Sequence, residues 1–242
     1  MKLYVIPASH PSMTAELMLK RKGLPYKRRD LITAMHIPIL KAMRFPNRTV
    51  PAIKSDGRKV QGTRAIARFL DEVQPEPPLF PSDPEKRRQV EEAERWGDEQ
   101  LQSVPRRLSW FALGRDRSDL KGFMEGYKLG LPTSVAVATA GPIIWAEQKI
   151  NKASAEAVRA DLQRLPELLD HVDKLITDGV IGGDEPNAAD YQIATSVRLL
   201  MAFEQLGPLI AGRPSAAFAE KIAPDPGGRI PAALPADWLP QT

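Results

Sequence analysis

The turn that holds Ser9 and Ser12 is the first place in this sequence where the residue types suggest chemistry. It lies between an apolar strand-like run and a helical pattern. A hydroxyl there sits at the positive end of a helix dipole, beside backbone N–H groups that have no helical partner. Such a place stabilises an anion, for example the thiolate of a bound ligand. The alternative role for either serine is helix capping.

Two further positions fit the binding of an extended, anionic ligand. Pro51 opens an expected strand, and in this order of elements we expect the Val50–Pro51 bond to be cis, which frees the Val50 backbone to pair with a ligand. The alternative is an edge-strand proline. Thr63 opens an expected helix, whose first N–H groups suit a carboxylate. The alternative for Thr63 is again a simple N-cap.

The residue inventory excludes several other kinds of site. The chain has no cysteine, so disulfides, cysteine nucleophiles and thiolate metal ligands are ruled out, and disulfide exchange is disfavoured. Its three histidines are His10, His36 and His171, which show no metal-ligand spacing. We therefore expect no metal site.

Strand and helix signals alternate over the first 73 residues. Strand-like runs cover 2–6, 26–31, 50–54 and 58–61, and helical patterns cover 12–22, a short stretch near 37–41, and 63–73. The first two strands should be parallel and the last two antiparallel, since only Ser55-Asp56-Gly57 separates the latter. This is the order of a thioredoxin-like domain, which we place at residues 1–74.

The remainder of the chain reads as helical. A proline-rich linker covers 75–84, with Leu79 and Phe80 as its anchors, and an all-helical domain with a proline-rich tail covers 85–242. Asn187 and Asp190 have the spacing of a capping box. The fold class is therefore an α/β domain followed by an all-α bundle. The expected helices cover 85–113 with a kink at Pro105, 120–150 with breaks near 130–132 and 141–142, 154–177, 187–206 and 215–222.

Charge divides the chain into a basic part and a mildly acidic part. Residues 1–80 hold 15 Lys/Arg against 6 Asp/Glu, and residues 81–242 hold 19 against 24. The basic groups flank a helix end and a strand start without interleaved aromatics, so we read them as solvated surface rather than a nucleic-acid site. No run suits a membrane span or a signal segment, and we expect a cytoplasmic protein.

Several short motifs, taken in order, resemble the cytosolic glutathione transferase superfamily over about residues 1–206. The motifs lie at residues 22–26, 50–53, 65–71 and 182–190, with the proline-rich linker between the third and fourth. The resemblance implies a homodimer that conjugates a thiol, with glutathione as co-substrate, to a hydrophobic electrophile, as in detoxification. A glutathione-dependent isomerase, or a non-catalytic or other-thiol-binding relative, stays open.

The same resemblance assigns roles to residues of the first domain. Ser9 falls where the serine-using tau-like and zeta-like classes place the hydroxyl that stabilises the glutathione thiolate, and Ser12 is the second candidate. Val50, with Pro51, would pair with the cysteinyl part of glutathione, and Thr63 would meet its γ-glutamyl carboxylate. Gly62 stands where the family has an acidic residue or glutamine, and Gln61 is one position away.

The second substrate would lie against the helical domain. The alternative for each candidate is a core or dimer contact. The candidates are Trp110, Phe111, Met124, Tyr127 and Trp145.

Overall fold

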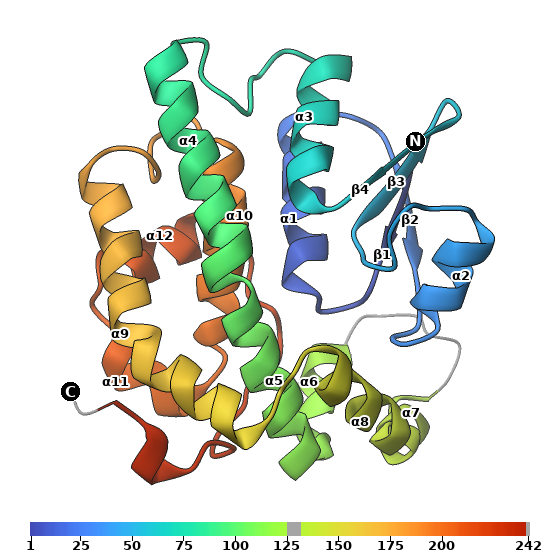
Figure 1. The fold of residues 1–242 in the computed structure, drawn as a ribbon, viewed down its shortest axis with the longest axis vertical. Helices are drawn as coiled ribbons and strands as arrows, with labels where there is room; N and C mark the ends of the chain where they lie inside the picture. Colours follow the sequence, from blue (N-terminus) through green and yellow to red (C-terminus); the bar gives the residue numbers. More distant parts are fainter. Residues whose placement is uncertain (125–131, 241–242) are drawn as a thin grey trace.

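The computed structural model describes residues 1–124 and 132–240, and its first part is a four-stranded sheet with helices on both faces (Figure 1). The strand order is β2-β1-β3-β4. The parallel pairing of β1 with β2 and the antiparallel pairing of β3 with β4 are as predicted, and β1 and β3 are also antiparallel. The elements are β1 Lys2–Val5, α1 His10–Arg21, β2 Lys27–Asp30, α2 His36–Ala42, β3 Ala52–Ser55, β4 Arg58–Gln61 and α3 Thr63–Val73. The fold is thioredoxin-like.

Local sequence explains where these elements begin and end. Helix α1 starts after Ser9, whose backbone is extended and whose side chain accepts from the Ser12 N–H. It stops before Gly23, which takes a positive φ of 62° that other residues avoid. Asp56 and Gly57 both have positive φ, which suits the tight hairpin between β3 and β4.

The two faces of the sheet bury different cores. Helices α1 and α3 lie between the sheet and the helical part of the chain (Figure 1), and their apolar side chains join the main core. Helix α2 covers the other face through a small separate cluster around Leu40 and Phe45. The two parts of the chain therefore meet at α1 and α3.

The second part is helical, with one interruption that the sequence did not predict. The expected kink at Pro105 is wrong: Pro105 lies in the first turn of α5, where a missing N–H costs nothing, and the break is a π-helical turn at Gly97–Leu101. The elements are α4 Pro84–Trp96, α5 Ser103–Arg115, α6 Leu120–Met124, α7 Thr133–Thr139, α8 Gly141–Ile150, α9 Ala155–Thr177, α10 Ala188–Leu200, α11 Gly207–Ile210 and α12 Pro214–Ile222.

The linker is fixed to both parts of the chain. Leu79 and Phe80 are buried, as expected, and the Leu79 carbonyl accepts from the Ala188 N–H at 2.9 Å. The ammonium of Lys22, fully buried, donates to the Gln74 and Pro77 carbonyls at 2.7 Å each. These contacts hold the end of α1 and the start of α10 against the same short segment.

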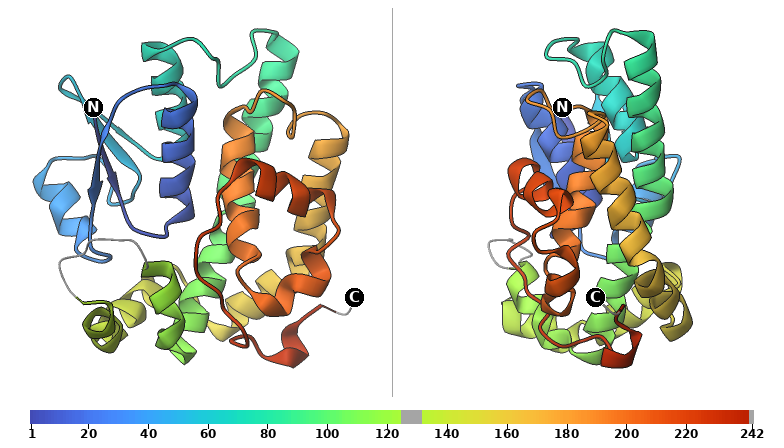
Figure 2. Two further views of the ribbon diagram at one scale, coloured as in Figure 1. Left: turned by 180° about the vertical axis from the view of Figure 1, so that it is seen from behind. Right: turned by 90° about the vertical axis from the view of Figure 1, so that its left-hand side faces the viewer.

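The C-terminal segment packs on the helical part, away from the sheet (Figure 2). Ile230 pairs with Phe203 as an isolated parallel bridge, and the Trp238 ring lies 5.6 Å from that of Phe111. Helix α10 ends at Leu200, earlier than expected, because the chain turns there to receive this segment. No described helix combines the length and apolar character that crossing a membrane requires.

Candidate functional site

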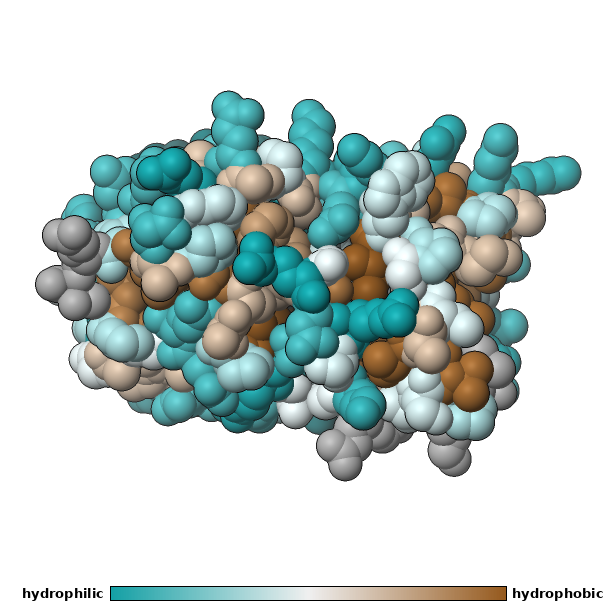
Figure 3. Space-filling model, turned by 90° about the horizontal axis from the view of Figure 1, so that it is seen from below, coloured by the Kyte–Doolittle hydropathy of each residue, from teal (hydrophilic) through white to brown (hydrophobic). Residues whose placement is uncertain are grey.

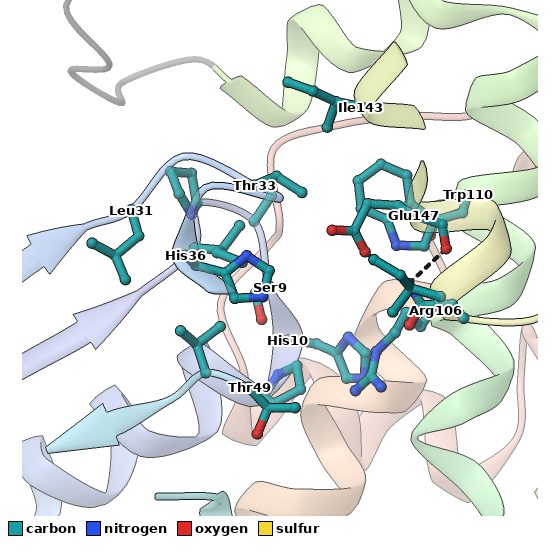
Figure 4. A pocket seen from close by; sticks show the side chains of 18 of the residues that line it. Ser9, His10, Leu31, Thr33, His36, Thr49, Arg106, Trp110, Ile143 and Glu147 are labelled. Atoms are coloured by element: carbon teal, nitrogen blue, oxygen red, sulfur yellow. Dashed lines mark hydrogen bonds between the residues drawn. The ribbon is translucent and has the colours of Figure 1, made fainter. Parts of the chain in front are cut away.

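A cleft of about 730 Å³ lies between the ends of the sheet elements and helices α5 and α8 (Figure 4). One wall comes from the turn before α1, the turn before β3 and the start of α3. The other comes from α5 to α8. Ile32 and Ile150 are exposed at its edge, and the view from below shows apolar patches among polar side chains there (Figure 3).

At the start of α1, Ser9 lines the cleft and caps the helix at the same time. Its Oγ accepts from the Ser12 N–H at 3.4 Å, while its hydroxyl hydrogen has no acceptor among the described residues. The His10 N–H is likewise unpaired within the part of the chain that the structure describes. Ser12 itself is buried below the cleft, where its Oγ accepts from the Ile6 N–H at 3.4 Å. The two serines thus differ in access: only Ser9 faces the cleft.

The turn before β3 has the predicted cis bond between Val50 and Pro51. Both residues line the cleft. The Pro51 carbonyl accepts from the Gly62 N–H at 3.0 Å, whereas the N–H and carbonyl of Val50 bond to no described residue. The backbone of Val50 is therefore available to a ligand.

Gln61 and Thr63 lie close in sequence and have different surroundings. The Gln61 side chain is buried outside the cleft lining, where it accepts from the Asn47 N–H at 2.8 Å and donates to the Thr49 carbonyl at 2.6 Å. Thr63 lines the cleft at the start of α3, next to Gly62 with its φ of 87°. The first N–H groups of α3 have no acceptor among the residues described.

The predicted second-substrate residues are only partly brought together. Trp110 and Met124 line the cleft. Phe111 instead faces the C-terminal segment, and Trp145 is 64% exposed outside the lining, with Lys149 near its ring. Tyr127 lies outside the described residues.

Several polar cleft residues were missed. Gln102 and Arg106 precede Trp110 at helical spacing, so the face that contains Trp110 already pointed to them. Glu147 reaches the cleft from α8, where burial raises the pKa of its carboxyl. His36 has its Nδ1 buried without a partner among the described residues. No local sequence signal marks His36 or Glu147.

His10 joins the two walls. Its Nε2 lies 3.1 Å from the Gln102 carbonyl, and since a carbonyl only accepts, Nε2 carries the hydrogen. The pKa of His10 lies well below its ordinary value, first because the ring is buried and second because the positive charge of Arg106 is near. The ring is neutral near pH 7, and it fixes the start of α1 against α5.

The described residues contain no group of three His, Asp or Glu side chains arranged to hold a metal ion. What the cleft does offer is unpaired donors. They come from the starts of α1 and α3 on one wall and from Arg106 on the other. Such a set of donors suits a ligand with several anionic groups.

Comparison with known proteins relates the first part of the chain to a protein family. Residues 3–78 match the glutathione S-transferase N-terminal domain family. A probable glutathione S-transferase from Nicotiana plumbaginifolia is 29% identical over 118 residues, which are 48% of this chain and 53% of that protein. The matching part of the chain thus spans about half the length of this curated relative.

Two solved structures share the fold over most of their length. A tau-class glutathione S-transferase from mango, Mangifera indica, superposes with a TM-score of 0.60 at 16% identity, covering 99% of this chain and 92% of that one. A bacterial zeta-class maleyl pyruvate isomerase gives 0.61 at 19% identity, covering 91% of each chain. Residues 3–78 thus match the glutathione S-transferase N-terminal domain family, and the described chain, with its thioredoxin-like sheet and helical second part, has the glutathione S-transferase fold.

Proposed function

We propose that this protein binds glutathione in the cleft and joins it through its sulfur to an electrophile held against α5 and α8. The observation that carries the proposal is the convergence of three unpaired backbone sites on one cleft: the start of α1, Val50 and the start of α3. Each suits a different part of an extended anionic tripeptide. The division into a thiol-binding domain, linker and helical domain, the homodimer and the cytoplasmic location stay predictions.

The thiolate would be stabilised at the start of α1. The Ser9 hydroxyl keeps its hydrogen free while its oxygen accepts from Ser12, so it is able to donate to sulfur. The neighbouring His10 N–H and the helix dipole add to the field. Lowering a thiol pKa by about 2 units requires roughly 2.7 kcal/mol, which a charge-assisted hydrogen bond and a helix N-terminus supply together.

In the transfer, the thiol proton leaves to water and the sulfur electron pair forms a bond to the electrophilic carbon. A leaving group departs with the electrons of the bond that breaks. Trp110 and Met124 would contact the electrophile, and Phe111 and Trp145 would not. Gln61 would act by holding the Asn47–Thr49 turn rather than by touching glutathione.

Calorimetric titration of glutathione tests the proposal. We expect a dissociation constant in the micromolar to millimolar range. Thr63→Ala should weaken binding roughly fivefold, because one hydroxyl contact is lost while the α3 amides remain. Thr177→Ala, an exposed threonine on α9, is the matched control and should change nothing.

The absence of any heat up to millimolar glutathione would contradict the proposal and favour a non-catalytic or other-thiol-binding relative. Thiol consumption during turnover then separates transfer from isomerisation, because an isomerase returns the thiol unchanged.

A further inference from the structure

Arg106 is a partly buried cation whose hydrogen-bond donors have no acceptor among the described residues. It extends from α5 into the cleft beside His10 and Glu147, facing the side that carries Ser9 (Figure 4). Within the described residues its guanidinium makes no ion pair and no hydrogen bond. Burial lowers the pKa of Arg106, which shows how poorly its charge is compensated.

The next residue shows what a structural arginine looks like in this helix. Arg107 donates from Nε and one terminal nitrogen to the buried Asp161 carboxylate, at 2.5 and 2.6 Å. This is the two-point pairing that an arginine fork makes with a carboxylate. Arg106 has the same donors but no such partner among the described residues, so these donors are available to an acceptor on a ligand.

The acidic side chains nearest to Arg106 are engaged elsewhere. Asp98 accepts from Gln102 Nε2 at 2.9 Å, and Glu147 accepts from Asn151 Nδ2 at 2.8 Å. Neither comes within ion-pair distance of the Arg106 guanidinium. Burial raises the pKa of both carboxyls.

Apolar side chains continue the cleft beyond Arg106. Trp110 and Leu113 follow it along the same face of α5, and Ile143 and Ile144 face them from α8. A ligand in this part of the cleft therefore meets a cationic fork next to the sulfur site and an apolar surface further away. The matching molecule is amphipathic, with an apolar body and one planar anionic group.

We propose that the second substrate carries a carboxylate, which Arg106 binds through its guanidinium while the apolar body lies against Trp110 and α8. That the ligand is a substrate rests on the proposed transferase function. That it carries a carboxylate rests on Arg106 alone. A partly buried charge without a partner is destabilised, so a ligand that supplies the missing acceptor gains affinity that an uncharged analogue does not.

Two glutathione conjugates of equal chain length give the test. S-(carboxypentyl)glutathione ends in a carboxylate, and S-hexylglutathione ends in a methyl group. In calorimetry we expect Arg106→Met to weaken the carboxylate conjugate roughly 10- to 100-fold and to leave the hexyl conjugate within about twofold. Arg106→Lys, which keeps the charge without the fork, should lie between them.

Arg115→Met is the matched control, because Arg115 lies on the same helix, is exposed, and does not line the cleft. Thermal melting of each variant shows whether it is folded. Equal losses for both conjugates in folded Arg106→Met, or no preference for the carboxylate in the wild type, would overturn the inference.

A second pair of probes separates this inference from the proposed function. Phenylbutyrate and phenylbutanol contain no glutathione and differ only in the anionic group. Stronger binding of phenylbutyrate that depends on Arg106 supports the carboxylate site even if glutathione does not bind. Glutathione binding without any such preference supports the transferase and rejects the carboxylate site.

Discussion

At the start of α10 the first three backbone N–H groups all have acceptors, whereas at the start of α1 the first one has none among the described residues. Ala188 donates to Leu79, and Ala189 and Asp190 donate to the Asn187 side chain. At α1, Ser9 caps only the Ser12 N–H, over a long 3.4 Å, and His10 is left open. Both turns have polar caps in the sequence, but one is closed by protein and the other faces a cleft.

The difference shows how to separate folding from binding among similar helix starts. A closed helix start contributes to stability and has nothing left to offer a ligand. An open one costs stability and keeps its donors for an anion. The start of α3 belongs with α1, because its first amides are also unpaired in the described part of the chain.

The largest effect is expected on stability, when the capping contacts at the start of α10 are removed. Asp190→Ala removes the acceptor of the Gly182 N–H at 2.6 Å and of the Asn187 N–H at 2.8 Å. Leaving two partly buried donors unpaired should lower the free energy of unfolding by about 3 kcal/mol, measured by urea denaturation. Glutathione affinity should not change. Weaker glutathione binding in a folded Asp190→Ala protein would break the distinction between the two helix starts.

The next effect is loss of the Ser9 hydroxyl. Ser9→Ala should reduce turnover with glutathione and an aryl halide roughly 30-fold, because a charge-assisted hydrogen bond to the thiolate is lost. Its cost in unfolding free energy should stay within about 0.5 kcal/mol, since the capping contact is long.

The matched control is Ser154→Ala, a serine that caps α9 outside the cleft. It should lower the unfolding free energy by about 1 kcal/mol and leave turnover unchanged. Unchanged turnover in both Ser9→Ala and Ser12→Ala would remove the proposed role of this turn.

The smallest effect concerns the pH dependence of the α1 start. The pKa of His10 in the folded protein lies well below its ordinary value. Between these two pKa values the unfolded chain binds a proton at His10 and the folded protein does not. Stability from this group is therefore fully present above about pH 6.5 and lost as the pH falls. Between pH 6.5 and 5.5 the loss should be about 1 kcal/mol.

The measurement is urea denaturation at both pH values for the wild type and His10→Asn. The variant should lose that part of the pH dependence which His10 contributes, and the comparison removes contributions common to both proteins. An identical pH dependence in the two proteins would contradict the assignment.

Sequence predicted most of what depends on neighbouring residues. The bounds of α3, the hairpin turn at Asp56–Gly57 and the capping box of Asn187 with Asp190 are all confirmed. Strand directions followed as well, because connection length decides them. The helix starts on the sheet side of the cleft have local signals of this kind, whereas the cis bond at Val50–Pro51 was expected from the order of the elements.

The helical wall was harder because distant contacts determine it. A Cβ at Gly97 would lie 2.9 Å from the Ile193 side chain, so this position needs a glycine where the helix passes close to α10, and the π-helical turn begins there rather than at Pro105. Phe111 is an aromatic residue of the kind that lines pockets. Its ring instead contacts Trp238, which lies near the other end of the chain. Arg106 lies one helical turn from Trp110, so helical spacing could have predicted that it lines the cleft. The sequence could not predict that it has no partner among the described residues.

The π-helical turn at Gly97–Leu101 holds about one residue more than an α-helical turn, because its backbone hydrogen bonds join residues five apart. Deleting one residue inside this turn would therefore leave an ordinary α-helical turn and keep Arg106 and Trp110 on the cleft side of α5. The same deletion in the regular part of the helix would rotate everything after it by about 100°. In lineages of such proteins, this turn is the place where the helix can gain or lose a residue without changing the surface that it presents to the cleft.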